Sequence, residues 1–305
     1  MPAPLHIPVL LHEVLTLLSP QPGQTYVDCT AGLGGHAAAV AARLIPGGTM
    51  VLADLDASNL ARAADRIRTE HATALTLHTF HGSFAGLPHQ LAALNLKANL
   101  VLADLGFASN QVDDASRGLS FSRDGPLDMR MNPAATTTAA HLVASLSETE
   151  LADIIFNFGE ERHSRRVAEA IVRARAQSPI TTTAHLADIV RSVVRRSPGG
   201  GIDPATRTFQ ALRMAVNDEL GNLGALLDAV ARPGPWLAPG AVVAIISFHS
   251  LEDRPVKQAF TRLVAAGAAE DLTPKPLRAG PSEVASNPRA GSAKLRAVRL
   301  VGQSG

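Results

Sequence analysis

The chain of 305 residues has little of several residue types, and each scarcity excludes a class of protein. Its single cysteine, Cys29, cannot form an internal disulfide or a cluster of thiolate metal ligands. No apolar run approaches the roughly 18–20 residues that a membrane-spanning helix requires. No lysine or arginine precedes Arg43, so the charged region that begins a secretory signal is missing. We therefore expect a cytoplasmic protein without membrane spans.

The chain also has almost no net charge, because 28 basic residues face 27 acidic ones. A protein that binds nucleic acid non-specifically usually carries a strongly basic domain, so any nucleic-acid contact here must be local. Aromatic residues make up only 4% of the chain, which leaves few surfaces for stacking on bases. Hydrophobic residues make up 46%, which excludes a disordered chain and suffices for a large core.

Short apolar runs alternate with helical patterns in the first hundred residues, which indicates an α/β fold with a parallel sheet and helices on both faces. We expect strands at residues 25–29, 49–55, 75–80, 100–105 and 241–248, and an antiparallel edge strand at 295–301. We expect helices of this domain at residues 37–44, 58–70, 87–94 and 251–264. Residues 272–292 are rich in Pro, Gly, Ser and Arg and predict an irregular strap.

The interval between residues 107 and 214 has a different character. A stretch rich in Gly, Pro and Asp leads into helical patterns at 147–158, 162–175 and 183–196, followed by a glycine-rich loop at 197–203. The first of these helices opens with the capping-box pattern of Ser147 and Glu150. The sequence thus predicts an α/β domain of residues 1–106 and 215–305, interrupted by a helical subdomain of residues 107–214.

Candidate ligand-binding residues lie at the ends of the predicted strands. The segment 28–37 reads DCTAGLGGHA, and its glycines allow close approach of a ligand before a helix N-terminus. Asp54 ends the second strand, where a carboxylate accepts hydrogen bonds from ribose in nucleotide-binding folds. Asp104 ends the fourth strand, so Asp28, Asp54 and Asp104 converge at the carboxyl edge of the sheet.

Two types of cofactor fit these residues. The pattern Gly32-x-Gly34-x-x-Ala37 satisfies the dinucleotide fingerprint, which keeps a nicotinamide-dependent oxidoreductase open. S-adenosylmethionine fits at least as well, because it needs ribose and adenine contacts and carboxylates near its sulfonium but no pyrophosphate site. Phe84 follows the third strand and is a candidate for packing on adenine, with core packing as the alternative. The loop at 107–114, beside Asp104, is a candidate site for a nucleophilic amine.

Longer blocks resemble a known family. They are DxTxGxGGH at 28–36, DLG at 104–106, QVDD at 111–114, RGLSFSRDGPLDMRM at 117–131, GEER at 159–162, PATRTFQALR at 204–213, SFHSLEDR at 247–254 and NPR at 287–289. In this order they resemble the ribosomal RNA small subunit methyltransferase H family, also called MraW. The resemblance covers nearly the whole chain.

The resemblance implies a class I methyltransferase sheet with an inserted helical subdomain. It implies an enzyme that uses S-adenosylmethionine to methylate the N4 amine of one cytidine, at position 1402 in the decoding region of 16S rRNA in the small ribosomal subunit. The implied cofactor-binding residues are Gly34, Gly35, His36, Asp54, Phe84, Asp104 and Gln111.

The candidate catalytic residues are Asp104 and Asp113 near the amine, with His249 opposite. The candidate RNA-contacting residues are Phe107, Ser109, Arg117, Arg130 and Arg207. No metal site is expected, because His249 has no partner His or Cys at ligand spacing.

The chain departs from the family pattern at a few positions. Ala108 and Asn110 stand where Ser and Pro are usual, Asp203 replaces His, and Gly291 replaces Arg. The altered loop at Ala108 and Asn110 keeps open a second hypothesis, a non-catalytic factor for assembly of the small subunit that retains the methyltransferase fold. The sequence leaves the oligomeric state open, with a homodimer as one option.

Overall fold

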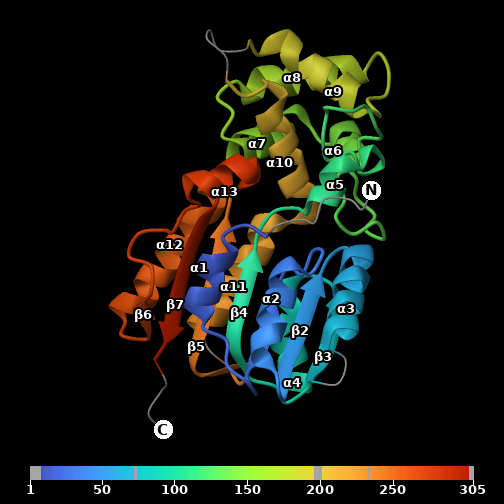
Figure 1. The fold of residues 1–305 in the computed structure, drawn as a ribbon. Helices are drawn as coiled ribbons and strands as arrows, with labels where there is room; N and C mark the ends of the chain where they lie inside the picture. The colour runs from blue at the N-terminus through green and yellow to red at the C-terminus, as the bar shows by residue number, and fades with distance from the viewer. Residues whose placement is uncertain (1–7, 72–73, 196–200, 233, 302–305) are drawn as a thin grey trace. The chain divides into compact units, whose positions relative to one another are not determined.

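The computed structural model describes residues 8–71, 74–195, 201–232 and 234–301, and the chain divides into two compact units (Figure 1). The α/β unit comprises Met1–Gly106 and Leu220–Gly305, and the helical unit comprises Phe107–Glu219. The predicted boundary at residue 214 lies inside helix α10, which continues to Asn217 and places the end of the unit at Glu219. Among the described residues, no helix is long and apolar enough to cross a membrane.

The α/β unit is built on a seven-stranded sheet of order β3-β2-β1-β4-β5-β7-β6. Its strands are β1 (Thr25–Asp28), β2 (Gly48–Asp54), β3 (Leu75–His81), β4 (Ala98–Asp104), β5 (Leu237–Ser247), β6 (Ala269–Asp271) and β7 (Lys294–Leu300). The pairs from β3 to β5 are parallel, and Val27 of β1 is in register with Val51 of β2 and Val101 of β4. The α/β fold class is therefore confirmed.

The prediction of an edge position for the last strand is wrong. Strand β7 is antiparallel, as expected, but it lies between β5 and β6. Most residues of β7 are buried, which suits an interior strand, whereas β6 has only three residues. A run of three residues is too short to show the alternation by which a strand is recognised in a sequence.

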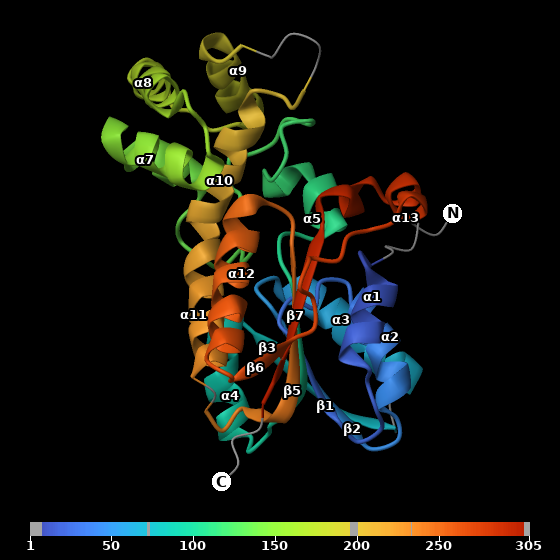
Figure 2. The ribbon, with the colours of Figure 1, turned by 90° about the vertical axis from the view of Figure 1, so that its left-hand side faces the viewer.

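Helices cover both faces of this sheet (Figure 2). One face packs against α1 (Leu11–Leu18), α2 (Gly35–Leu44) and α3 (Ala57–His71), and the other against α4 (Leu87–Ala93), α11 (Glu219–Ala231) and α12 (Ser250–Ala265). Neighbouring side chains of β1 serve opposite faces, because Tyr26 packs in the cluster with α1 and α2 and Val27 in the cluster with α11 and α12. Helices α1 and α11 lie outside the helices predicted from the sequence.

The strap at residues 272–292 is less irregular than predicted. It contains helix α13 (Pro281–Ser286) and a 3-10 turn at Pro288–Ser292. The carboxylate of Glu283 accepts a hydrogen bond from the backbone N–H of Leu10 at 2.7 Å. The strap therefore fastens the segment that precedes α1.

The helical unit has a core of its own. Its helices are α5 (Ser109–Asp113), α6 (Ala139–Ser145), α7 (Glu148–Gly159), α8 (Ser164–Arg175), α9 (Thr183–Val193) and α10 (Ala205–Asn217). Leu151, Ile171 and Leu186, from three of these helices, are fully buried in one cluster. The predicted capping box is present, because Ser147 accepts from the N–H of Glu150 and the Glu150 carboxylate accepts from the N–H of Ser147. Residues 196–200, within the predicted glycine-rich loop and helix end, lie outside the described residues.

Candidate active site

The candidate site lies at the carboxyl ends of β1, β2 and β4, where the chain order of the strands reverses between β1 and β4. Ligands of open α/β sheets bind at such a switch point. Asp28 ends β1 and is 2% exposed, with its oxygens held by the hydroxyl of Tyr26 at 3.0 Å and the N–H of Thr30 at 3.1 Å. Burial raises the pKa of Asp28 to about 7, although both hydrogen bonds act in the opposite direction.

Two neighbouring acids after β2 have different structural roles. Asp54 accepts from the N–H of Gly32 at 2.7 Å and from the N–H of Asp56 at 2.8 Å, which ties the end of β2 to the glycine turn. Asp56 is buried and caps helix α3, accepting from the N–H groups of Ser58 and Asn59. Asp54 is therefore the carboxylate at the strand end that can also accept hydrogen bonds from a ribose.

The glycine turn between β1 and α2 leaves no room for side chains. Gly34 has a φ of +76°, and a Cβ there would lie 3.0 Å from the Cα of Ala63 in α3. A Cβ on Gly35 would lie 2.6 Å from Cγ of Pro8. His36, in the first turn of α2, is 7% exposed, and its Nε2 lies 2.9 Å from the carbonyl oxygen of Val9. The segment before α1 thus packs directly on the turn.

Asp104 ends β4 and has a pKa far above the usual value for an aspartate. Burial, the charge of Asp28 and the charge of Glu252 raise the pKa of Asp104 to about 8. Its Oδ1 is buried and has no hydrogen-bond partner among the described residues, whereas Oδ2 lies 3.6 Å from Nδ1 of His36. The side chain as a whole is 23% exposed. A buried carboxylate oxygen without a hydrogen-bond partner lowers the stability of the fold, unless a ligand supplies the missing partner.

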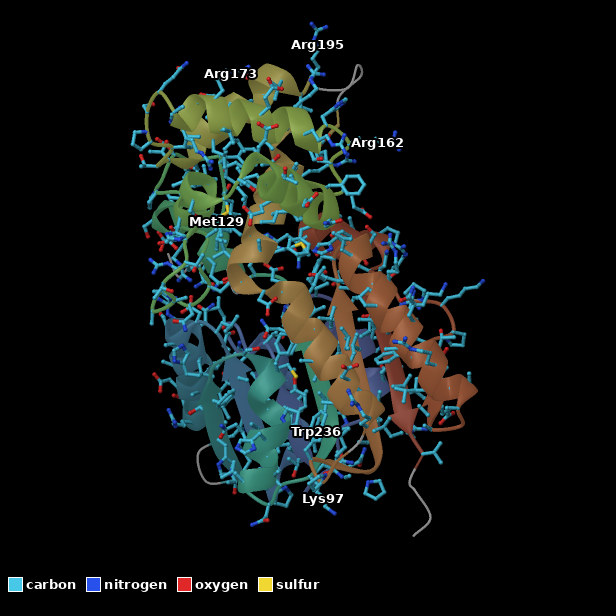
Figure 3. All side chains as sticks on the ribbon, turned by 180° about the vertical axis from the view of Figure 1, so that it is seen from behind. Lys97, Met129, Arg162, Arg173, Arg195 and Trp236 are labelled. Carbon is cyan, nitrogen blue, oxygen red and sulfur yellow. The ribbon has the colours of Figure 1, made fainter. Side chains whose placement is uncertain are left out.

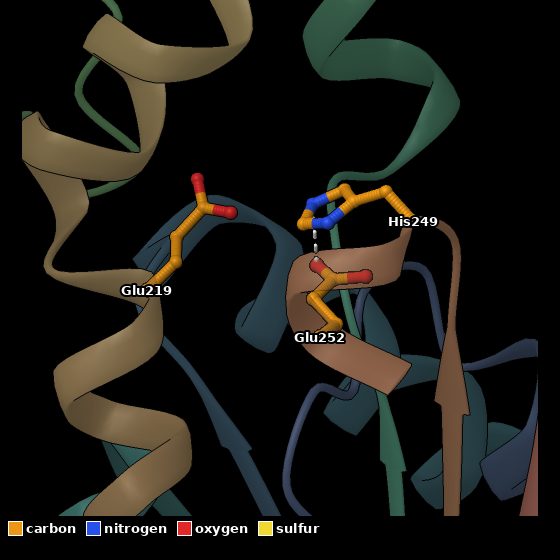
Figure 4. Close-up of side chains that lie close together, drawn as sticks. All are labelled: Glu219, His249 and Glu252. Atoms are coloured by element: carbon orange, nitrogen blue, oxygen red, sulfur yellow. Dashed lines mark ion pairs between the residues drawn. The ribbon is translucent and has the colours of Figure 1, made fainter. Parts of the chain in front are cut away.

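His249 lies between β5 and α12, at the same edge of the sheet, and is the N-cap residue of α12. Its Nε2 lies 3.1 Å from Oε1 of Glu252, as drawn in Figure 4, without the angles of a hydrogen bond. The other oxygen of Glu252 accepts from the N–H of Phe248 at 2.8 Å. Glu252 is 3% exposed. It was not singled out from the sequence, although it belongs to the block SFHSLEDR.

The remaining predicted cofactor residues have defined local environments. Phe84 lies in the 3-10 turn after β3, is 8% exposed and belongs to the core cluster of the sheet. Its contact with adenine stays a prediction. Gln111, in the helical unit, is 4% exposed, and its Oε1 accepts from the N–H of Ala108 at 2.9 Å at the start of α5.

Arg117 and Arg130, predicted as RNA contacts, hold the loop in which they lie. Arg117 donates from one nitrogen to the carbonyl oxygens of Arg130 and Met131, at 3.1 and 2.7 Å. Arg130 binds the carboxylate of Asp128 at 2.6 Å and donates to the carbonyl of Ala135, also at 2.6 Å. Arg130 keeps the pKa of Asp128 below its usual value despite partial burial. The structure therefore gives these two guanidinium groups a role in positioning residues 117–135.

Phe107 and Arg213 form a stacked pair in the helical unit. The guanidinium of Arg213 lies 4.6 Å from the centre of the Phe107 ring, and two of its nitrogens donate to the carboxylate of Glu219 at 2.8 Å each. Phe107 remains 38% exposed. Such a cation–π contact fixes the orientation of the ring while its exposed part stays accessible.

The other predicted RNA and catalytic residues of this unit differ in exposure. Asp113, at the end of α5, is exposed. Arg207 is 44% exposed and lies 3.8 Å from the carboxylate of Glu161. Ser109 begins α5, and its side chain lies outside what the structure describes. Figure 3 shows the side chains of Arg162, Arg173 and Arg195 extending outward from the helical unit.

The raised pKa values predict a specific pH dependence of stability. With no ligand bound, the native protein holds more protons than the unfolded chain between about pH 4 and pH 8, because Asp28 and Asp104 titrate near 7 and 8 instead of 3.8. The free energy of unfolding should therefore fall as pH rises from 5.5 to 8, by up to about 5 kcal/mol. The lowered pKa of Asp253, beside Arg296 and Lys294, acts only at more acidic pH.

Urea denaturation of the ligand-free protein at pH 5.5 and pH 8 measures this difference. In the variant Asp104→Asn the difference should shrink, because one of the two titrating groups is gone. A wild-type protein that is more stable at pH 8 than at pH 5.5 would contradict the assigned charge states.

The sheet order 3-2-1-4-5-7-6 with one antiparallel strand, the glycine turn after β1 and the acids ending β1, β2 and β4 define a class I methyltransferase. The sequence matches the model of the MraW methylase family over residues 3–301. It is 47% identical to the ribosomal RNA small subunit methyltransferase H of Sorangium cellulosum (strain So ce56), covering 97% of this chain and 91% of the relative. It is also 47% identical to the protein of that name from Acidobacterium capsulatum, covering 96% and 97%.

The chain therefore belongs to the MraW methylase family, and its cofactor is S-adenosylmethionine. The described residues fit this group. The Asp54 carboxylate lies at the end of β2, where such folds bind ribose hydroxyls. The backbone of the Gly34 and Gly35 turn has no side chains to block a ligand, and the unpartnered Oδ1 of Asp104 suits a cationic neighbour. The glycine pattern allowed either a nicotinamide cofactor or S-adenosylmethionine, and membership of this family decides in favour of S-adenosylmethionine.

Proposed function

We propose that the protein methylates the N4 amine of a single cytidine, position 1402, in the decoding region of 16S rRNA within the small ribosomal subunit. The observation that carries this proposal is the match over nearly the whole chain to relatives named for methylation of small-subunit rRNA. The buried carboxylate of Asp104 at the cofactor edge supports it, because an amine that attacks a methyl group must lose a proton. Since the ribosome is cytoplasmic, the proposal includes a cytoplasmic enzyme.

The proposed roles follow the chemistry of methyl transfer. S-adenosylmethionine supplies an electrophilic methyl group on its sulfonium. Asp54 orients the ribose, Phe84 and Gln111 complete the cofactor contacts, and the turn at Gly34, Gly35 and His36 closes on it. Asp104 and Asp113 accept hydrogen bonds from the target amine, with His249 opposite.

The helical unit is proposed to recognise the RNA. The exposed part of the Phe107 ring, held by Arg213, is placed to stack on an unpaired cytosine, a mode of recognition common for single-stranded RNA. Ser109 and Arg207 are proposed further contacts. Arg117 and Arg130 are proposed to act through the loop they hold, since their guanidinium groups bind its carbonyl oxygens.

The test is methylation of small subunits purified from a strain that lacks the gene. The protein is incubated with S-adenosylmethionine and these subunits, and the RNA is digested and analysed by mass spectrometry. We expect N4-methylcytidine at one decoding-region cytidine. If the modification is absent although the protein binds the cofactor, the non-catalytic assembly factor suggested by Ala108 and Asn110 replaces this proposal.

A further inference from the structure

The imidazole of His36 is held in one tautomer. Its Nε2 lies 2.9 Å from the carbonyl oxygen of Val9, and both groups are buried. A carbonyl oxygen can only accept a hydrogen bond, so Nε2 must carry the hydrogen. In the neutral ring, Nδ1 then carries a lone pair and no hydrogen. Pro8 packs on Gly35 at the start of the same helix, and Glu283 fastens Leu10, so the carbonyl that sets the tautomer is itself fixed.

The lone pair of Nδ1 faces a second acceptor. Oδ2 of Asp104 lies 3.6 Å from Nδ1 of His36. A carboxylate beside a lone pair is repulsive, whereas one proton between them makes the contact favourable, either as a carboxylic acid beside a neutral imidazole or as a carboxylate beside an imidazolium. Oδ1 of Asp104 is buried and has no hydrogen-bond partner among the described residues, so little else there stabilises its negative charge.

The other groups around the pair also favour retention of a proton. Asp28, from β1, and Glu252, from α12, are both buried acids whose charges act on Asp104. The hydroxyl oxygen of Thr30 accepts a hydrogen bond from the backbone N–H of Asp104 at 2.7 Å. Tyr26 donates its hydroxyl to Asp28 and not to Asp104. The pKa of Asp104 is accordingly raised to about 8.

We infer that His36 and Asp104 share one proton in the free protein and release it when the cationic methyl donor binds, which leaves the Asp104 carboxylate ready to accept the proton of the target amine. In that reaction the amine nitrogen forms a bond to the methyl carbon as the carbon–sulfur bond breaks, and the electron pair of that bond stays on sulfur. The extra proton on nitrogen then passes to Asp104. This last step rests on the proposed function, whereas the proton release does not.

Calorimetry can count the released protons without any methyl transfer. S-adenosylmethionine and S-adenosylhomocysteine are titrated into the full-length protein at pH 7 in buffers with different enthalpies of ionisation. A positive charge within about 4–6 Å lowers the pKa of a carboxyl group by about 1–3 units, so we expect S-adenosylmethionine to release roughly 0.4–0.9 proton. S-adenosylhomocysteine lacks the sulfonium charge and should release less than about half as much.

Variants assign the proton to the pair. Asp104→Asn should abolish the difference between the two ligands. His36→Gln keeps a donor for the Val9 carbonyl but lacks the Nδ1 lone pair that faces Asp104, and should change the number of protons released at pH 7 from the wild-type value. His141→Gln, an exposed histidine of the helical unit, is the control and should behave as wild type. Equal proton release by both ligands, or an unchanged difference in Asp104→Asn, would overturn the inference.

The tautomer provides an independent measurement on the wild-type protein. Nitrogen NMR of the histidine rings should show the Nε2–H tautomer for His36 in the free protein, and a hydrogen on Nδ1 alone would contradict the assigned geometry. Proton release without N4-methylcytidine in the RNA assay would refute the proposed substrate and leave the His36–Asp104 pair standing.

Discussion

Replacing Asp104 with asparagine should reduce the rate of methyl transfer to small-subunit RNA by about 10²–10⁴-fold, the usual loss on removal of a general base. The amide has the shape of the carboxyl group but cannot accept the amine proton. The substitution should not destabilise the ligand-free fold, because it removes a buried acid that Asp28 and Glu252 already disfavour in its charged form. A loss of activity with retained stability would separate a catalytic role from a structural one.

Single-turnover kinetics with saturating S-adenosylmethionine is the measurement for this prediction, together with the thermal stability of the same preparation at pH 8. The matched control is Asp65→Asn, an aspartate of α3 whose side chain is 76% exposed, and it should react at the wild-type rate. Activity of Asp104→Asn within about threefold of wild type would remove Asp104 from the reaction and leave Asp113 as the candidate acceptor.

Replacing Gly125 with alanine should disorganise the loop of residues 115–131 and lower methyl transfer by at least about 100-fold. A Cβ on Gly125 would lie 2.0 Å from the carbonyl oxygen of Ala115, and a Cβ on Gly118 would lie 2.0 Å from the carbonyl oxygen of Pro126. The two segments therefore pack backbone against backbone, and the obstructing atoms cannot rotate away as a side chain would. The proposed acceptor Asp113 and the loop-holding Arg117 both adjoin this contact.

The α/β unit should be unaffected by this change. Its contacts with S-adenosylmethionine should therefore persist, and the protein should still bind the cofactor while RNA methylation is lost. Hydrogen exchange across residues 115–131 should rise in the variant. Gly224→Ala is the control, since a Cβ at that position in α11 meets no atom within 4 Å and alanine favours a helix by about 1 kcal/mol. Equal activity of the two alanine variants would show that the close contact is dispensable.

The parts of the fold predicted correctly are those that local patterns encode. Strands β1 to β5 and helices α2, α3 and α4 follow from apolar patterns of the right length and period, and the start of α7 follows from Ser147 and Glu150. The edge position predicted for β7 was wrong for a tertiary reason. Strand β7 lies inside the sheet because β6, a strand of only three residues, pairs with it and forms the edge.

The amino-acid sequence alone determined the fold class, the glycine turn after β1 and the acids at the strand ends, because each depends on residues adjacent in the chain. The tertiary structure decided which groups those residues contact. It separated Asp54 from Asp56, placed His36 between Val9 and Asp104, and engaged Arg117 with the carbonyls of its own loop. Hydrogen bonds and charge effects of this kind act over a few ångströms, between groups that only folding brings together. The number of residues between two groups in the sequence does not indicate whether they lie that close.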